Sequence, residues 1–244
     1  FIKLLNQLGV ATQPSNMSFS VQSAQSGLEY NGTSLNHLFA QRTNLLRPSF
    51  HRMLRDILRF YREAGELLEG RDRSTTLGAY LDDNKYSDEF VRDHLIPMGA
   101  AVWSANPAQM REFPAQSFIR FFHNHGFLQR NDRPKWRVVR GGSQRYVEAL
   151  TRPFADRIRR RSPVSAIARY PDRVEITVGD RPPERFDEVV IAAHSDQALR
   201  MLADPSPAES QILGALRYQR NETVLHTDKK LLPRKKLAWA SWNY

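Results

Sequence analysis

The sequence predicts an α+β protein with a mainly helical half and a half rich in strands. In residues 33–130, apolar residues recur every three or four positions over two long stretches, which is typical of amphipathic helices. From residue 131 onward, short runs of β-branched and apolar residues alternate with turns. The chain of 244 residues is long enough for one large domain or two small ones. We expect four parts: an entry segment 1–32, a helical domain 33–130, a β-rich domain 131–218 and return strands 219–244.

The entry segment predicts a short helix and a small hairpin. An apolar stripe over residues 1–8 indicates the helix, and Gly9 can end it. Residues 17–31 alternate weakly and break at Ser26-Gly27, which favours a hairpin. The chain starts on the apolar stripe without an N-cap and closes on an aromatic, strand-like segment at 237–244. We therefore expect the sequence to be a piece of a longer protein.

The helical half begins with a short helix and continues with a long one. Thr33 or Ser34 can cap a short helix that runs to Gln41. Apolar residues at three- and four-residue spacings then predict a long helix over about 50–69, which Gly70 ends.

Shorter helices complete this half. Residues 76–81 and 87–91 predict two of them, the second with a capping-box start. Pro97-Met98-Gly99 is expected to break the helical pattern, because proline lacks the N–H that a helix interior needs. A strong helix with a phenylalanine-rich face follows Pro114.

The β-rich half starts with a strand, a sharp turn and a helix. A turn at 131–134 leads into a strand at 136–140, which Gly141-Gly142 ends. Residues 143–154 place apolar side chains on one face and predict a helix.

Three strands are expected next, at 164–170, 174–178 and 186–193. A tight turn at Pro171-Asp172 joins the first two. The third contains five consecutive apolar residues, Val189 to Ala193, which is typical of a strand covered on both faces. We therefore expect it to be buried.

Two helices and two strands close the chain. The helices are expected from Ser195 onward and at 207–216. The strands are expected at about 219–227 and 236–244, on either side of a turn at 228–230.

Composition excludes several classes of protein. The absence of cysteine excludes disulfides, thiolate metal sites and cysteine nucleophiles. No apolar run approaches the roughly 18–20 residues that span a bilayer, and the first residues are not a secretory signal. We expect a cytoplasmic protein of bacterial type.

Motifs for hydrolysis, nucleotide binding and metal binding are missing. The sequence lacks the GxSxG elbow and the phosphate-binding patterns GxGxxG and GxxxxGK[ST], so this chain alone offers no nucleotide cradle. His123 and His125 lie two residues apart on an expected helix, where their side chains diverge by about 200°. We expect no metal site.

The charge suggests an anionic partner. The chain has 36 basic and 26 acidic residues, which give a net charge of +10. Residues 133–161 carry ten Lys or Arg and two acidic residues. The aromatic rings of Trp136 and Tyr146 lie among them and could stack against nucleobases. No known nucleic-acid motif accompanies them. A basic module that binds nucleic acid or an anionic surface is therefore the alternative function, and an interaction domain is a third.

One ordered stretch resembles a known family. Residues 136–150 read WRVVRGGSQRYVEAL, Ser162-Pro163-Val164 follows, and residues 186–193 read FDEVVIAA. This resembles the flavin-containing amine oxidase superfamily, which includes monoamine oxidases and phytoene desaturases, over about 135–203. More loosely, the whole chain is similar to the middle of predicted FAD-binding proteins related to the flavoprotein segment of some cyclopropane fatty acid synthases. The segments 225–228 and 240–244 fit that subgroup.

The resemblance implies an α/β flavoprotein of the FAD/NAD(P)-binding type, present here in part, and an FAD-dependent oxidoreductase. It implies that Val164 lies on the strand beside the adenine of FAD and that Ala192, Ala193 and His194 end a strand at the cofactor. Residues 33–130 would form the substrate-side domain. The substrate-side candidates are Trp103, Lys135, Trp136, Thr223 and Trp242.

The resemblance also implies what these residues lack. The family's Gly-rich βαβ unit would lie before Phe1 and its closing segment after Tyr244, so residues 1–244 alone are expected to be inactive and to bind FAD negligibly. Many amine oxidases carry a lysine in the strand that corresponds to 219–227, whereas the matching position here falls near Thr223. Amine oxidation and a desaturase-type hydride transfer on a lipid-like substrate both stay open. We expect a small-molecule substrate, peripheral contact with anionic lipid, and no nucleic acid.

Overall fold

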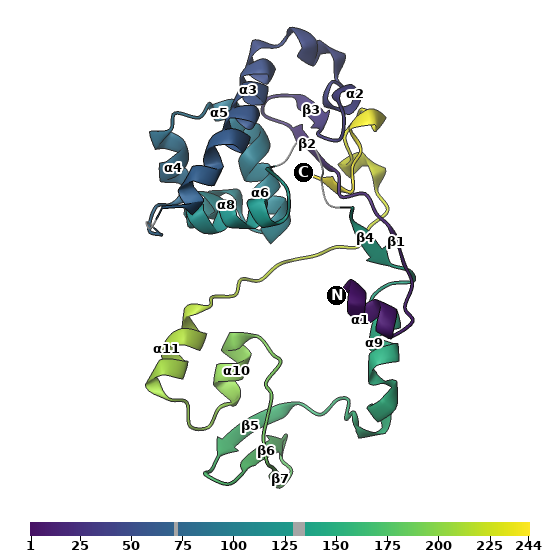
Figure 1. Ribbon diagram of the computed structural model, residues 1–244, viewed down its shortest axis with the longest axis vertical. Coiled ribbons are helices and arrows are strands. Elements are labelled where there is room, and N and C mark those ends of the chain that lie inside the picture. Colours follow the sequence, from purple (N-terminus) through teal and green to yellow (C-terminus); the bar gives the residue numbers. More distant parts are fainter. Residues whose placement is uncertain (71–72, 129–134) are drawn as a thin grey trace. The chain divides into compact units, whose positions relative to one another are not determined.

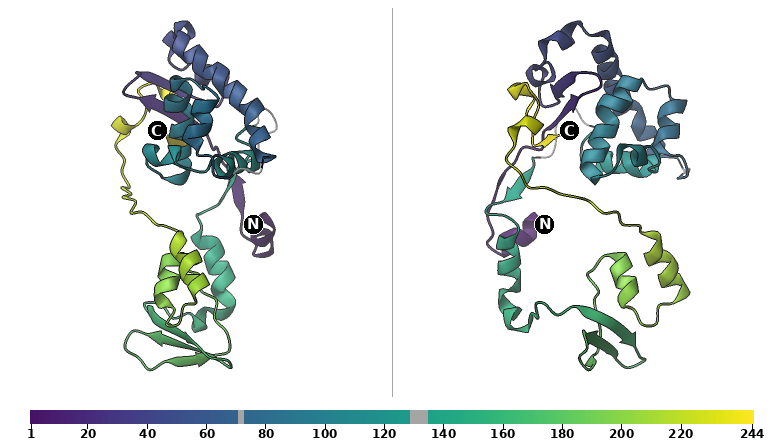
Figure 2. Two further views of the ribbon diagram at one scale, coloured as in Figure 1. Left: turned by 90° about the vertical axis from the view of Figure 1, so that its left-hand side faces the viewer. Right: turned by 180° about the vertical axis from the view of Figure 1, so that it is seen from behind.

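The computed structural model describes residues 1–70, 73–128 and 135–244, which divide into two compact units. Unit 1 comprises residues 1–149 and 225–244, and unit 2 comprises residues 150–224. Figures 1 and 2 show the elements coloured along the chain. The turn expected at 131–134 lies outside the described residues. The four-part division expected from the sequence stays a prediction.

A three-stranded sheet in the order β3–β2–β8 belongs to unit 1. Strands β2 (Phe19–Ser23) and β3 (Leu28–Asn31) are antiparallel, so the expected hairpin is confirmed. Strand β8 (Trp242–Asn243) pairs with β2 in parallel, with Trp242 opposite Phe19. The hydroxyl of Ser20 donates to Asn243 Oδ1 at 2.8 Å, across 223 positions of the chain. The sheet therefore joins the two ends of the sequence.

The prediction of a strand over 236–244 is wrong, except for Trp242 and Asn243 of β8. Residues Lys236–Ala238 form a 3-10 helix, η6, which follows η5 (Lys229–Leu231). The backbone N–H of Ala238 donates to Lys235 O, and that of Trp239 donates to Lys236 O. Because these donors are satisfied within the turn, they are not available to a strand ladder.

A second, two-stranded sheet and two helices complete the ends of unit 1. Strand β1 (Thr12–Pro14) pairs antiparallel with β4 (Arg137–Val139), so the expected strand after residue 135 is confirmed. Gly141 and Gly142 follow with φ of +79° and +85°, a backbone conformation that favours glycine, and this confirms the sharp break. The expected helices are α1 (Ile2–Gln7) and α9 (Gln144–Thr151), and the 3-10 helix η4 (Arg152–Arg157) follows α9.

The helical half of unit 1 follows the predicted order. Its segments are α2 (Leu35–Leu38), η1 (Arg42–Leu46), α3 (Pro48–Glu63), η2 (Ala64–Leu68), α4 (Leu77–Asp83), α5 (Asp88–Phe90), η3 (Val91–Leu95), α6 (Ile96–Trp103), α7 (Pro107–Arg111) and α8 (Ala115–Asn124). The side chains of Ser34, Thr76 and Ser87 each accept a hydrogen bond from a backbone N–H three residues on. These helix starts are confirmed, because a capping side chain acts locally. The capping box expected at 87–91 is wrong, because the third helical residue is Phe90, whose side chain cannot accept the N–H of Ser87. Asp56 Oδ2 accepts this N–H instead, at 2.9 Å.

The break expected at Pro97-Met98-Gly99 is wrong, because helical structure runs through these residues. The π-helical turn η3 passes directly into α6. Pro97 lacks the N–H that would bond to the carbonyl of Asp93, four residues earlier. That carbonyl instead accepts a hydrogen bond from the hydroxyl of Tyr30 at 3.0 Å. The wider π-helical turn before Pro97 relieves the clash between its ring and the preceding turn.

The core of unit 1 lies among these helices and the hairpin. Its fully buried side chains of large volume include Tyr30, Phe50, Phe60, Phe90, Phe118, Phe122, Met53, Leu77, Leu81, Leu95 and Met110. Gly99 of α6 packs so closely on this core that a Cβ there would lie 2.8 Å from Phe118 and 2.9 Å from Met110. A side chain therefore does not fit at this glycine.

We expect Gly99→Ala to lower the free energy of unfolding by about 1–3 kcal/mol, because the new methyl group must displace fully buried neighbours. Gly65→Ala is the matched control, since a Cβ at Gly65 meets no atom within 4 Å. Urea unfolding of both variants measures the difference. A Gly99→Ala protein as stable as the Gly65→Ala protein would contradict this packing.

Unit 2 contains a three-stranded antiparallel sheet and two helices. The strands are β5 (Val164–Arg169), β6 (Val174–Val178) and β7 (Glu184–Phe186), in the order β5–β6–β7. The helices are α10 (Ser195–Met201) and α11 (Pro207–Ala215), as expected. Among the described residues 150–224, only Ile167, Ser195 and Ala198 are buried. Unit 2 therefore has a small core of its own.

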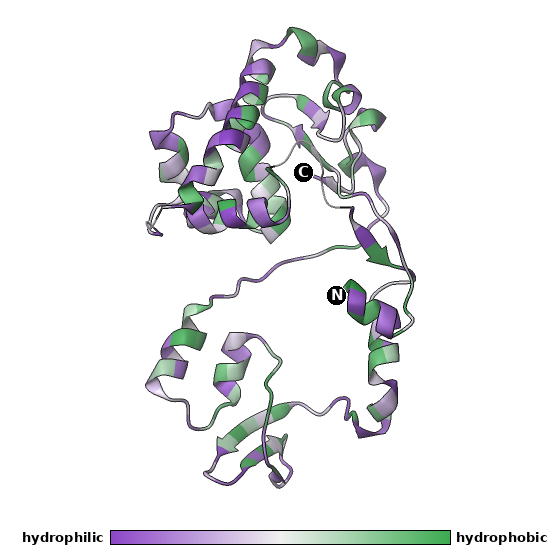
Figure 3. Ribbon diagram, viewed as in Figure 1, coloured by the Kyte–Doolittle hydropathy of each residue, from purple (hydrophilic) through white to green (hydrophobic). Residues whose placement is uncertain are grey.

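Two expected strands of this part are wrong. The third strand ends at Phe186, and Val189 to Ala193 form an extended stretch outside any strand, with Val190 91% exposed. Figure 3 shows this apolar stretch in green before α10. Residues 219–227, which run from unit 2 into unit 1, are exposed and belong to no strand. A strand needs a neighbour for its backbone N–H and C=O groups, and no described strand lies beside either segment.

No helix among the described residues is both long and apolar enough to cross a bilayer.

Candidate functional site

Val164 begins β5, which is an edge strand of the sheet in unit 2. On its inner side, β5 pairs with β6, and Val164 lies opposite Val178. On its outer side, the N–H of Ala203 donates to Ile167 O at 2.9 Å. Among the described residues, no other backbone group bonds to this outer edge near Val164. The start of β5 therefore presents main-chain donors and acceptors that a ligand can meet.

An arginine fixes this strand to the start of α11. The guanidinium of Arg169 donates to Glu209 from Nη1 at 2.6 Å and from Nη2 at 3.0 Å. It also donates from Nε to Asp204 Oδ1 at 3.2 Å. Hydrogen bonding from Arg169 lowers the pKa of the Glu209 carboxyl to about 2. At neutral pH the Glu209 carboxylate is therefore charged, and its hydrogen bonds with Arg169 hold β5 to α11.

Ala192, Ala193 and His194 lie in the extended stretch that leads into α10. All three residues are exposed. Small side chains at Ala192 and Ala193 leave the backbone open to close approach by another group. The sequence predicts this stretch as a buried strand end, whereas the structure leaves it uncovered.

Sequence reasoning missed Tyr218, which holds His194 and the first residue of α10. The rings of His194 and Tyr218 stack with centroids 4.5 Å apart and planes only 6° apart. The hydroxyl oxygen of Tyr218 accepts a hydrogen bond from the backbone N–H of Ser195 at 3.1 Å. Since Tyr218 lies beyond α11 in the sequence, no local pattern could have predicted this contact.

The substrate-side candidates do not form one cluster. Trp103 packs its ring against four phenylalanines of unit 1, at centroid distances from 4.6 to 6.2 Å: Phe113, Phe118, Phe121 and Phe122. Trp136 precedes β4 and Trp242 lies in β8, and no ring contact joins the three tryptophans among the described residues. Lys135 is exposed beside Trp136, and Thr223 lies in unit 2 in a segment that belongs to no strand.

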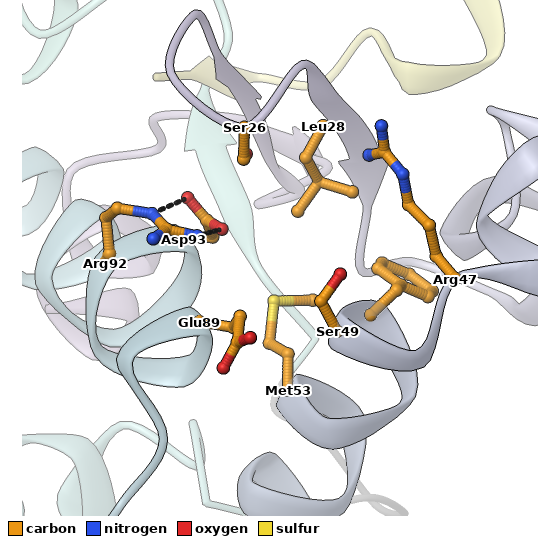
Figure 4. A pocket seen from close by; sticks show the side chains of 9 residues that line it. Ser26, Leu28, Arg47, Ser49, Met53, Glu89, Arg92 and Asp93 are labelled. Atoms are coloured by element: carbon orange, nitrogen blue, oxygen red, sulfur yellow. Dashed lines mark hydrogen bonds and ion pairs between the residues drawn. The ribbon is translucent and has the colours of Figure 1, made fainter.

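A cavity of about 220 Å³ lies in unit 1 between the turn of the hairpin, the start of α3 and the α5–η3 helix (Figure 4). Its walls are formed by Ser26, Leu28, Arg47, Ser49, Phe50, Met53, Glu89, Arg92 and Asp93. Arg92 donates two hydrogen bonds to the buried Asp93, at 2.9 and 2.5 Å, so this carboxylate is already paired. None of the residues that the sequence predicts for the site lines this cavity.

No group of three or more potential metal ligands occurs among residues 1–70, 73–128 and 135–244. His123 lies in α8 and His125 just after it. The Nδ1 of His125 is 2.8 Å from Phe121 O, so its ring caps the end of the helix.

Comparison with families of known proteins identifies the chain. The model of a family described as flavin containing amine oxidoreductase matches residues 1–235. The chain belongs to this family. Membership implies FAD as the cofactor. A search of curated proteins finds no match for this flavin amine oxidoreductase chain.

Solved structures share the fold at low identity. A wild-type putrescine oxidase bound to putrescine is 16% identical with a TM-score of 0.64, and the match covers 87% of this chain and 49% of that one. Cyclohexylamine oxidase from Brevibacterium oxydans IH-35A is 18% identical with a TM-score of 0.59, covering 87% and 48%. A CLA-producing fatty acid isomerase from P. acnes is 14% identical with a TM-score of 0.55, also covering 87% and 48%. The chain spans about half the length of these structures.

The residues present fit one side of an FAD site. The outer edge of β5 near Val164 offers unpaired main-chain groups for a base edge. The exposed backbone at Ala192 and Ala193 allows the close approach that a dinucleotide needs. The sequence contains no GxGxxG turn, so the residues described here provide no cradle for the pyrophosphate.

Proposed function

We propose that this chain is part of an FAD-dependent oxidoreductase that oxidises a small amine or lipid-like substrate. The observation that carries the proposal is the family match over residues 1–235 of the 244. FAD supplies the electron acceptor for such a reaction, taking a hydride from a C–H bond of the substrate. The protein's task is to bind the cofactor, orient the substrate and exclude water.

In this proposal, unit 2 holds the adenosine side of FAD. Main-chain groups of β5 at Val164 pair with the adenine, while Ala192 and Ala193 let the backbone approach the dinucleotide. The ring of His194 stacks on Tyr218 and so fixes the backbone between the proposed cofactor site and α10. The stretch Val189–Ala193 supports this view, because none of its five apolar residues is buried and Val190 is 91% exposed, so the stretch needs a cover. We propose that the family's Gly-rich βαβ unit provides that cover and the missing pyrophosphate cradle.

We propose that unit 1 binds the substrate. Lys135, Trp136 and Trp242 are candidates to contact the substrate, and the fourth candidate, Trp103, shapes the site through its phenylalanine cluster. Thr223 is proposed for the position at which many family members carry a lysine. The substrate class stays open between amines and lipid-like molecules. We also propose a cytoplasmic location and peripheral contact with anionic lipid.

Anaerobic mixing of the flavin-loaded complete gene product with candidate substrates tests the function. Putrescine and cyclohexylamine represent the amines, and an unsaturated fatty acid represents the lipids. We expect one class to bleach the flavin absorbance, because substrate oxidation would reduce the flavin and no oxygen is present to reoxidise it. A chemical reductant that bleaches the same sample is the control. A flavin that this reductant reduces but no amine or lipid reduces would contradict the proposal.

The basic cluster at 157–161 gives little support to the nucleic-acid alternative. Arg159 forms an ion pair with Glu184 of β7, so part of the cluster serves the sheet of unit 2. Any duplex binding by the remaining arginines is expected to be weak and to fall steeply with salt, because it depends on the release of counterions.

A further inference from the structure

We infer that unit 1 carries a surface that docks on an anionic lipid membrane. We call it the basic leucine surface. It consists of α2, η1 and the following Arg47, together with residues 229–239. Its cations are Arg42, Arg47, Lys229, Lys230, Arg234, Lys235 and Lys236, and its exposed leucines are Leu35, Leu45, Leu46 and Leu231. The inference rests on the proposed contact with anionic lipid and names the residues that make this contact.

The two segments of this surface are far apart in sequence but joined in the fold. Helix α2 packs against η6 and β3. The amide Nδ2 of Asn31 donates to Trp239 O at 2.8 Å, and the backbone N–H of Lys235 donates to Glu29 Oε2 at 2.9 Å. Figures 1 and 2 show the purple α2 beside the yellow end of the chain. Arg42 of η1 in turn donates from Nη2 to Asn36 Oδ1 of α2 at 2.7 Å. Helix α2 therefore links η1 to residues 229–239 within unit 1.

The surface carries a large excess of positive charge. Residues 30–55 and 229–244 contain no aspartate or glutamate. Asp228 lies at the edge of the surface, where its carboxylate accepts the backbone N–H of Lys230 at 2.9 Å. The one carboxylate that reaches the surface from β3, Glu29, is buried and accepts the N–H of Lys235. None of the seven cations forms an ion pair with a residue that the structure describes. In unit 2, by contrast, Arg159, Arg169 and Arg173 are all paired.

Exposed leucines accompany these cations. The four leucines are between 52% and 89% exposed, with Leu46 the most exposed of them. An apolar side chain gains free energy when it enters the boundary between lipid head groups and acyl chains, while lysine and arginine stay at the charged surface. A nucleic acid attracts the same cations, but it buries exposed leucines less fully than the acyl region of a bilayer does. The combination therefore favours an anionic membrane as the partner.

Sedimentation with lipid vesicles tests the inference on the flavin-loaded complete gene product. We expect binding to vesicles of phosphatidylcholine and phosphatidylserine at physiological salt, and little binding to phosphatidylcholine alone. The double variant Lys235→Gln/Lys236→Gln should weaken binding about 30-fold, since each cation near an anionic surface contributes about a factor of five. Leu46→Ser should weaken it about ten-fold through lost insertion.

Matched variants in unit 2 serve as controls. Arg160→Gln/Arg161→Gln removes the same charge, and Leu216→Ser removes an exposed leucine, and each should change vesicle binding less than two-fold. Equal loss in both double variants would overturn the inference, because net charge would then explain the binding. Failure to sediment with phosphatidylserine, or full competition by duplex DNA without any effect of Leu46→Ser, would also overturn it. Flavin content measured in the same samples tests the proposed oxidoreductase separately.

Discussion

Acidification from pH 7 to pH 4 is expected to lower the free energy of unfolding by about 3 kcal/mol through His94 alone. Burial lowers the pKa of the His94 imidazole to about 3, against about 6.5 in an unfolded chain. Because the folded pKa is the lower one, protonation favours the unfolded state. The stability is fully present above pH 6.5 and is lost as the pH falls toward 3.

The hydrogen bonds around His94 explain why it stays neutral. The carbonyl of Asp93 can only accept, so the hydroxyl of Tyr30 donates to it. The Nδ1–H of His94 then donates to the oxygen of Tyr30 at 2.8 Å, and Nε2 is left buried with no partner among the described residues. Protonating Nε2 would bury a charge without a partner. The neighbouring carboxylate of Asp93 is already paired with Arg92.

Urea unfolding over a series of pH values checks this prediction. His94→Gln should flatten the dependence of stability on pH between 6.5 and 4, whatever its effect on stability at neutral pH. His51→Gln, which changes an exposed histidine of α3, should leave the slope as it is in the unchanged protein. An unaltered slope in His94→Gln would contradict the buried, neutral state of this side chain.

Val164→Asp and Ala193→Trp are each expected to reduce the FAD content of the complete gene product more than ten-fold. The aspartate would place a carboxylate at the strand edge proposed for the cofactor, and each lost main-chain contact weakens binding further. The indole of Ala193→Trp would block the close backbone approach, and because Ala193 is exposed, folding should tolerate it. Flavin absorbance after gel filtration gives the content per chain.

The controls lie on neighbouring elements. Val178→Asp alters the residue opposite Val164 on β6, and Ala208→Trp adds an indole to an exposed position of α11. Both should retain FAD. If the Val164 and Ala193 variants fold and keep full flavin occupancy, these two positions do not face the cofactor.

Local chemistry made much of the fold predictable. The cap at Ser34, one of two candidates, the helix start at Ser87 and the sharp turn at Gly141 depend on neighbours within a few residues, and the structure has all three. Helix continuity at Pro97 could not be predicted, because the freed carbonyl of Asp93 finds its donor in Tyr30, 63 residues away. Whether a proline ends a helix can be predicted only when the partner of the freed carbonyl is known.

Strands were harder to predict than helices for the same reason. A helix satisfies its own backbone, whereas the run Val189–Ala193 needs strands on both sides that the described residues do not provide. The apolar pattern predicts that other residues cover this segment, but it does not show which residues they are. For the candidate site, the ordered motif led to β5 and the stretch before α10, while the contact of Tyr218 with His194 came only from the fold.

The FAD content of the purified complete gene product is the most direct test of the central claim, that this chain is part of an FAD-dependent oxidoreductase. The measurement is the amount of FAD per protein chain, released by denaturation and identified by mass. We predict close to one FAD per chain, present on purification or after incubation with FAD. A folded gene product that carries no FAD and takes up none from an excess would contradict the claim.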